Sequence, residues 1–227
     1  MSKPYIVVIS GPSGAGKTVL SNKLKNENFS EILSVTTRQP RNGEKQGQHY
    51  DFITSEKFEE LSLKNKLIEK VEVNGNKYGI TDDEVLKVTA NNKPIVVVAE
   101  PHGVAQIKDY CEEKKWDCLS VFINSPVDIL MKRLLSRYDS EIENLDKNKE
   151  NHHEMKEKIH GIYASRIEHV FFKEQKEWVQ PAYGENTIFD LVFDEFNEKV
   201  EKNVIEKIIM NLTLNTLDDA MQNKLSR

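Results

Sequence analysis

The chain has 227 residues, of which 38% are hydrophobic and 30% charged, proportions that suit one soluble globular domain with at most a small inserted one. A net charge of −5 gives no electrostatic footprint for nucleic acid, and no apolar run approaches membrane-spanning length, so we expect neither partner. Cys111 and Cys118 form no metal pattern or disulfide framework, and no signal peptide precedes the first predicted strand; we therefore expect a cytoplasmic protein.

The first elements predict a phosphate-binding P-loop. The apolar run from Tyr5 to Ile9 predicts a buried strand, and a helical spacing predicts a helix over about 16–26. Between them lies Gly11-Pro-Ser-Gly-Ala-Gly-Lys17-Thr18, which fits G-x-x-x-x-G-K-[ST] at every fixed position. The strand–loop–helix context opposes the alternative that a glycine-rich turn matches by chance.

The residue types fit this chemistry. Glycines allow backbone N–H groups to turn toward phosphate oxygens, where a Cβ would obstruct them. The lysine reaches the β- and γ-phosphates, and the hydroxyl of Thr18 can ligate Mg²⁺, the expected cofactor. We therefore expect an ATP site formed by Gly11, Ser13, Gly14, Ala15, Gly16, Lys17 and Thr18.

The next segment breaks the rhythm of strand and helix. It predicts, in order, a strand at 32–35, a basic loop at 36–49, a strand at 49–53, a helix from Thr54 or Ser55 to about 64, a strand at 67–73, a turn at Asn74-Gly75 and a helix capped by Thr81. We interpret it as a subdomain inserted at the carboxyl ends of the strands, where such sheets bind ligands.

The remaining chain returns to alternating elements. We predict strands at 94–99, 119–123 and 188–193, and helices at 102–114, from Pro126, at 159–178 and at 196–212. Residues 138–158 are mostly charged or amide side chains and are expected to be a solvated run. The tail from Thr213 is either a short docking helix or frayed. The alternation predicts an α/β fold with a mainly parallel sheet flanked by helices.

A second group of residues lies in the inserted segment. Arg38 and Arg41 stand three residues apart on the basic loop, so both guanidinium groups can converge on one phosphate. Tyr50, Glu69 and Tyr78 follow. Taken singly, each of these residues fits an ordinary surface charge or a half-buried strand position.

Taken together, these motifs resemble the guanylate kinase family. They are Ser-Gly-Pro-Ser-Gly-x-Gly-Lys, Ser-x-Thr-Thr-Arg-x-Pro-Arg-x-Gly-Glu, Tyr-x-Phe, Glu69 and Tyr78-Gly79, and the resemblance is clear from about residue 5 to Gly103. It implies a P-loop kinase with a core (1–33, 82–137 and 167–212), a subdomain binding the nucleoside monophosphate (34–81), a helical lid (138–166) and a C-terminal tail (213–227).

The resemblance also implies roles for single residues. Arg38, Arg41, Tyr50 and Tyr78 would hold the phosphate of GMP, while Ser34 and Glu69 would read the guanine edge. A carboxylate suits that edge, because guanine presents N1–H and N2–H₂ donors side by side and adenine does not.

Two regions depart from the family pattern. The stretch after the central strand lacks its first acid, since Val98 stands there, and Glu100 matches the second acid, for contact with substrate or metal water. The lid lacks its usual Arg-Gly-Thr-Glu motif, and the stretch is longer by nearly twenty residues. We match Arg137 and Arg166 to the lid arginines that bridge the two phosphates, with Arg133 as the other candidate.

These residues predict ATP-dependent phosphoryl transfer to GMP or dGMP by a monomer or homodimer. The departures leave open a deoxynucleoside monophosphate kinase with another base choice. A catalytically inactive guanylate-kinase-like binding module is the third interpretation, which the intact Lys17, Thr18, Arg38 and Arg41 oppose.

Overall fold

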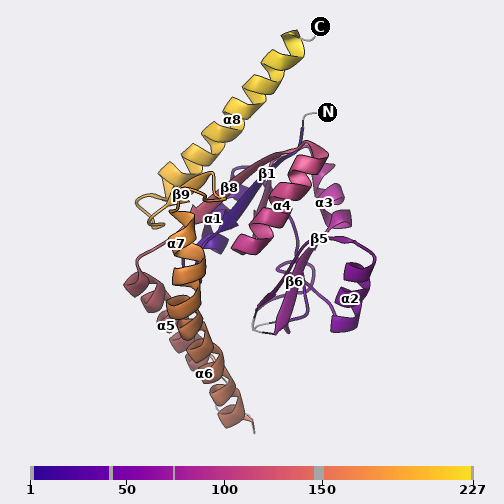
Figure 1. The fold of residues 1–227 in the computed structure, drawn as a ribbon. Helices are drawn as coiled ribbons and strands as arrows, with labels where there is room; N and C mark the ends of the chain where they lie inside the picture. Colours follow the sequence, from indigo (N-terminus) through magenta and orange to yellow (C-terminus); the bar gives the residue numbers. More distant parts are fainter. Residues whose placement is uncertain (1–2, 41–42, 74, 146–150, 226–227) are drawn as a thin grey trace.

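The computed structural model describes residues 3–40, 43–73, 75–145 and 151–225 and contains a five-stranded parallel sheet (Figure 1). The strand order is β2-β7-β1-β8-β9. The strands are β1 (Tyr5–Ser10), β2 (Ser30–Glu31), β7 (Ile95–Val98), β8 (Asp117–Ile123) and β9 (Leu191–Phe193). β1 lies at the centre and is buried along its whole length, as a continuous apolar run predicts for a parallel strand. The predicted α/β fold is thereby confirmed.

Helices cover both faces of this sheet. Alternate residues of β1 point to opposite sides, so Val7 and Ile9 join one apolar core while Ile6 and Val8 join the other. The first core is covered by α1 (Lys17–Asn26), α5 (Val127–Glu143) and α8 (Glu201–Leu225). The second is covered by α3 (Asp82–Thr89) and α4 (Pro101–Lys114).

A second sheet is built entirely from residues 35–81. Its order is β4-β3-β6-β5, with β3 (Val35–Thr36), β4 (Asp51–Phe52), β5 (Leu67–Val73) and β6 (Asn76–Thr81), and α2 (Ser55–Leu63) accompanies it. The single strand predicted at 32–35 is wrong. The chain pairs with the main sheet at β2, leaves it, and pairs with the second sheet only at β3. Asn74, in the predicted turn, lies outside the described residues.

The charged stretch after residue 137 is helical on both sides of residues 146–150, which lie outside the described part. α5 runs to Glu143, and α6 (His152–Glu168) continues into the π-helix η1 (His169–Val179) and α7 (Gln180–Ala182). α5 and α6 contact each other through hydrogen bonds of two tyrosines: the hydroxyl of Tyr138 lies 2.7 Å from His160 Nδ1, and that of Tyr163 donates to Glu141 over 2.7 Å. We call α5 and α6 the arm.

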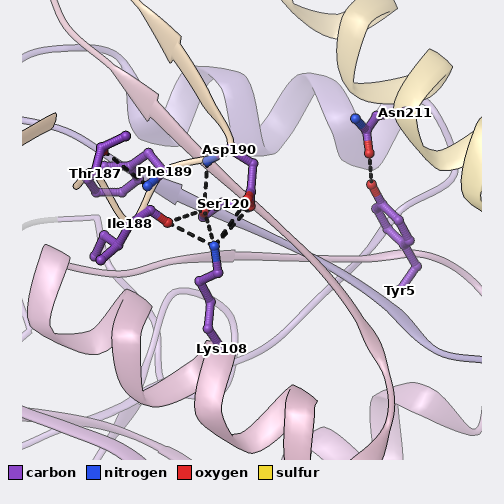
Figure 2. Close-up of polar contacts among 8 residues, drawn as sticks. All are labelled: Tyr5, Lys108, Ser120, Thr187, Ile188, Phe189, Asp190 and Asn211. Atoms are coloured by element: carbon purple, nitrogen blue, oxygen red, sulfur yellow. Dashed lines mark hydrogen bonds and ion pairs between the residues drawn. The ribbon is translucent and has the colours of Figure 1, made fainter. Parts of the chain in front are cut away.

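The last helix differs from its prediction at both ends. α8 begins at Glu201 and continues to Leu225, so most of the predicted tail belongs to the same helix. The hydroxyl of Tyr5 donates to Asn211 Oδ1 over 3.0 Å and ties α8 to β1 (Figure 2). Figure 1 shows that α8 projects from the side of the main sheet opposite to the arm and the second sheet. None of the described helices is long and apolar enough to cross a membrane.

A polar cluster around the buried Ser120 fixes the chain before β9 to α4 and β8 (Figure 2). The Ser120 hydroxyl lies 2.8 Å from the carbonyl of Ile188 and 2.7 Å from Asp190 Oδ2, and it accepts from the Asp190 N–H over 3.1 Å. Lys108 Nζ lies 3.1 Å from Asp190 Oδ1 and closes the cluster from α4. The buried hydroxyl of Ser120 is therefore hydrogen-bonded, while Asp190 and Lys108 remain partly exposed.

We expect Ser120→Ala to lower the free energy of unfolding by about 1 kcal/mol, because it removes the hydrogen bonds of a fully buried hydroxyl while its partners keep other bonds. Urea unfolding measures this loss. Ser165→Ala, at an exposed position of α6, is the matched control, with an expected change within about 0.5 kcal/mol. Equal changes in the two variants would show that the cluster does not stabilise the fold.

Candidate active site

The loop after β1 follows a path that requires glycine. Gly11 has φ 146° and lies so close to β8 that a Cβ would stand 2.0 Å from the carbonyl oxygen of Ile123. Gly16 has φ 107°, and its Cβ would meet the Phe196 ring at 2.7 Å. Gly14 also has a positive φ, of 87°, and Ala15 between them is fully buried. The loop leads directly into α1, whose N-terminal N–H groups favour an anion.

Lys17 begins α1 and turns back over the loop. Its Nζ donates to the carbonyl oxygens of Gly11 over 2.7 Å and Pro12 over 3.0 Å. Burial lowers the pKa of Lys17, and the nearby carboxylates of Glu174 and Glu100 oppose that shift. Thr18 follows in the first turn and is exposed. The predicted phosphate-binding residues are thus gathered around one lysine.

Arg133 of α5 supports the loop from behind. Its guanidinium group donates to the carbonyls of Gly14 (3.0 Å), Ala15 (3.3 Å) and Phe196 (2.9 Å) and to the Ser125 hydroxyl (3.1 Å). These bonds commit Arg133 to the protein backbone. The geometry therefore opposes the alternative that Arg133 bridges the substrate phosphates.

Sequence reasoning missed a carboxylate that lies against the loop. Glu174 of η1 is 1% exposed and accepts hydrogen bonds from the N–H and the hydroxyl of Ser13, each over 2.8 Å. The signal in the sequence is an acid between Val170 and Trp178 at a spacing of four residues, because both of those apolar side chains are buried.

The second sheet gathers the residues predicted for the acceptor phosphate. The Arg38 guanidinium pairs with both carboxylate oxygens of Glu44, over 2.8 and 3.0 Å, and lies 5.4 Å from the centre of the Tyr50 ring. Tyr50 packs edge-on against Tyr78 at 6.0 Å. Nε of Arg38 is buried and has no hydrogen-bond partner among the described residues. Arg41 lies outside them.

Two carboxyl groups with raised pKa values lie near the start of α4. Glu69 of β5 is 4% exposed, and burial together with the charge of Glu100 raises its pKa to about 8. Burial raises the pKa of Glu100, the residue before α4, to about 7, although Lys17 opposes the shift. A Cβ on Gly103 would stand 2.5 Å from Glu69 Oε1, so glycine makes room for this carboxyl. Ser34 lies half-buried just before β3.

The two predicted lid arginines lie around one tyrosine of the arm. The Arg166 guanidinium is 5.0 Å from the centre of the Tyr163 ring. Burial and the carboxylate of Glu141 raise the pKa of Tyr163 to about 12, and the charges of Arg166 and Arg137 oppose that rise. Arg137 is exposed, and its charge also acts on Lys17. The arm therefore presents positive charge beside the P-loop.

A cavity of about 260 Å³ lies between β5, the start of α4 and η1. Its lining includes Glu100, His102, Lys173 and Trp178. The Val98 side chain packs against the apolar core at the end of β7, where the family pattern has an acid. The arrangement places an anion-binding loop opposite a sheet that carries an arginine, two tyrosines and a buried carboxyl, and so can align two phosphorylated ligands.

We expect Arg133→Met to lower the free energy of unfolding by about 2–4 kcal/mol, because it leaves partly buried carbonyl groups of the P-loop without a charged donor. Arg137→Met, one turn later on the same helix but exposed, should change it by no more than about 0.5 kcal/mol. Thermal and urea unfolding compare the two variants. Similar losses in both would contradict the supporting role of Arg133.

The chain was compared with known proteins. The family model described as guanylate kinase matches residues 2–181. The guanylate kinase of Clostridium tetani is 37% identical over 139 residues, which cover 60% of this chain and 65% of that protein. The guanylate kinase of Wolinella succinogenes is 39% identical over 150 residues, covering 64% of this chain and 67% of that protein. The match thus spans about two thirds of the length of these relatives.

A solved structure gives the same result for the fold. The crystal structure of guanylate kinase from Anaplasma phagocytophilum superposes with a TM-score of 0.57 over 95% of this chain and 88% of that one, at 24% identity. At this identity the likeness concerns the fold alone. The family match covers most of the chain and agrees with the P-loop and the second sheet, and we conclude that the chain belongs to the guanylate kinase family.

Proposed function

We propose that the chain transfers the terminal phosphoryl group of ATP to GMP or dGMP, giving ADP and the guanosine diphosphate. The observation that carries this proposal is the position of Glu69. Its buried carboxyl lies on the second sheet, which also carries Arg38, Tyr50 and Tyr78. The charge of Glu100 acts on Glu69, and the charge of Lys17 in the P-loop acts on Glu100. The residue that would recognise the base therefore lies near those that would bind the phosphates.

Glu69 would select the base. An ionised carboxylate accepts both the N1–H and the N2–H₂ of guanine, and the Ser34 hydroxyl would donate to O6. Adenine has no such pair of donors, so it would leave a buried carboxyl group without partners at a cost of a few kcal/mol, about 1–3 for each unsatisfied group.

The phosphate of the acceptor would lie on Arg38. Glu44 already orients this guanidinium group, the Nε donor is buried without a partner in the described structure, and Tyr50 and Tyr78 flank it. Arg41, from the same loop, would add a second guanidinium group. Two such groups can bind one phosphate through paired hydrogen bonds.

The reaction needs no general base, because an acceptor phosphate oxygen is already anionic. Catalysis then consists of alignment and charge neutralisation. Lys17 would hold the donor, while Arg137 and Arg166 would neutralise charge on the group in transit. We assign the core to 1–33, 82–137 and 167–212, the acceptor subdomain to 34–81 and the lid to 138–166. Closure of the lid would exclude water.

The residues of the P-loop fit Mg²⁺ bound together with ATP. Mg²⁺ keeps several waters and takes phosphate oxygens, so it needs few ligands from the protein. The exposed Thr18 hydroxyl in the first turn of α1 would be one of them. The ion would supply charge neutralisation on the phosphates. We propose the cytoplasm as the compartment, consistent with two free cysteines.

A panel of nucleoside monophosphates tests the base choice. With ATP and Mg²⁺, we expect ADP release with GMP and dGMP and at most about 1% of that rate with AMP, CMP, UMP or dTMP, because a missing hydrogen-bond pair in a buried site costs several kcal/mol. Turnover with another base would support the altered-base alternative. The absence of turnover with every nucleotide would support a binding module.

The pKa of Glu69 predicts how GMP affinity depends on pH. The carboxyl is protonated below about pH 8 in the empty site, and guanine needs its ionised form. GMP binding should therefore release a proton, and affinity should fall by up to about tenfold per unit below pH 8. The charge of Glu100 acts on Glu69, and the charges of Lys17, Glu174 and Lys173 act on Glu100 in turn.

Titration calorimetry between pH 6.5 and 8.5, in buffers of different ionisation enthalpy, measures both the affinity and the released proton. Glu69→Gln is the matched control: it should bind GMP more weakly and lose most of the pH dependence in this range. A steep pH dependence that persists in Glu69→Gln would assign the proton to another group.

A further inference from the structure

The most informative contact outside the proposed mechanism joins η1 to the P-loop. Both carboxylate oxygens of Glu174 are engaged by Ser13, one by its N–H and the other by its hydroxyl, each over 2.8 Å. The side chain of Glu174 is almost fully buried. A carboxylate in this position makes the bonds that a phosphate oxygen would make with a backbone N–H of the loop.

The position of Lys17 indicates which phosphate the carboxylate replaces. The P-loop lysine contacts the outer phosphates of a bound triphosphate. The charges of Glu174 and Glu100 both act on Lys17, whose Nζ is bonded to the carbonyls of Gly11 and Pro12 in the same loop. Glu174 is therefore held at Ser13 by two hydrogen bonds and lies near the lysine that would contact the outer phosphates.

The helix that carries Glu174 is not an ordinary α-helix. η1 spans His169–Val179, and its last bond runs from the Gln180 N–H to the carbonyl of Gln175, five residues earlier. His169 Nε2 lies 3.8 Å from Glu174 Oε1, outside hydrogen-bond distance. Both His169 Nε2 and Gln175 Nε2 are buried without hydrogen-bond partners in the described structure. π-helical turns are rare and are frequently found at functional sites.

We propose that Glu174 is a specificity-determining residue that takes the place of the donor's terminal phosphate when the site is empty. A nucleoside triphosphate must displace this carboxylate from Ser13, because two anions cannot share the same N–H. A diphosphate, which ends one phosphate earlier, leaves it in place. Donor and product are thus distinguished by whether Glu174 has left the loop. This inference rests on the proposed function in one respect, which is that the phosphoryl donor is ATP.

The test measures binding without turnover. Dissociation constants for AMP-PNP and for ADP are determined by calorimetry in the wild type, in Glu174→Gln and in the control Glu168→Gln, an exposed acid in the same continuous helix. We expect Glu174→Gln to bind AMP-PNP roughly tenfold more tightly, the scale of one charge-assisted hydrogen bond, with ADP affinity within about twofold. Glu168→Gln should leave both affinities unchanged.

Two results would overturn the inference: unchanged or weaker AMP-PNP binding in Glu174→Gln, or equal tightening for AMP-PNP and ADP. Fluorescence provides a second readout that needs no change at Glu174. Trp178 lies on η1, with its ring 5.8 Å from His169. In a Trp116→Phe background, AMP-PNP should shift the emission of Trp178 and saturating ADP should not; equal shifts, or none, would also reject the proposal.

The proposed function and this inference fail separately. A chain that binds AMP-PNP with the expected preference yet phosphorylates no monophosphate would remove the kinase activity and retain the role of Glu174. A chain that phosphorylates GMP but shows the same affinities in Glu174→Gln as in the wild type would do the reverse.

Discussion

The architecture depends on the close approach of the loop after β1 to the neighbouring strand β8. At Gly11 the backbone of the loop lies against the carbonyl oxygen of Ile123, and there is no space for a side chain. This contact exists because β1 and β8 pair in register to their ends. It fixes where α1 starts and therefore where Lys17 and the N-terminal N–H groups of α1 lie. The two apolar cores meet on β1, so the most buried strand of the protein positions its anion-binding loop.

Negative side chains surround this site for anions, and the two kinds of acid have different consequences. Glu69 and Glu100 are carboxyls whose pKa values are raised mainly by burial, and the charge of Glu100 adds to the shift at Glu69, so their charge is partly suppressed. Glu174 has its donors already, from Ser13. The positive charge of Lys17 is thus balanced by the protein's own acids, Glu174 and Glu100, and under our proposal a bound nucleotide would replace Glu174 at the loop.

The parts of the fold predicted from sequence are those that local patterns specify. The P-loop, β1 and the caps at Thr54 and Thr81 follow from residue spacing and side-chain chemistry, and the structure contains each of them. The helices of the arm are predicted only near its base, and residues 138–158 are predicted as a solvated run, because their contacts are polar pairs between half-buried rings such as Tyr138–His160 instead of aliphatic stripes.

The site was only partly accessible from the sequence for a related reason. Arg133 and Arg137 share a helix and a residue type, and only the fold shows that the first is bound to loop carbonyls and the second is exposed. Glu174 is far from Ser13 in the chain, and no local motif connects them. Residues proposed to contact the ligand could be found from sequence motifs. Arg133 and Glu174, which contact the loop, could be recognised only from the tertiary contacts in the structure.

The arm is attached to the rest of the molecule in a way that limits how it can move. α5 is bonded to the P-loop through Arg133, and η1, which follows α6, is bonded to the same loop through Glu174. With both attachments in place, the arm cannot pivot as a lid attached at one point does. If Glu174 leaves the loop, only the attachment through Arg133 remains and the arm can pivot about it. The mobility of the arm would therefore report whether the loop is filled.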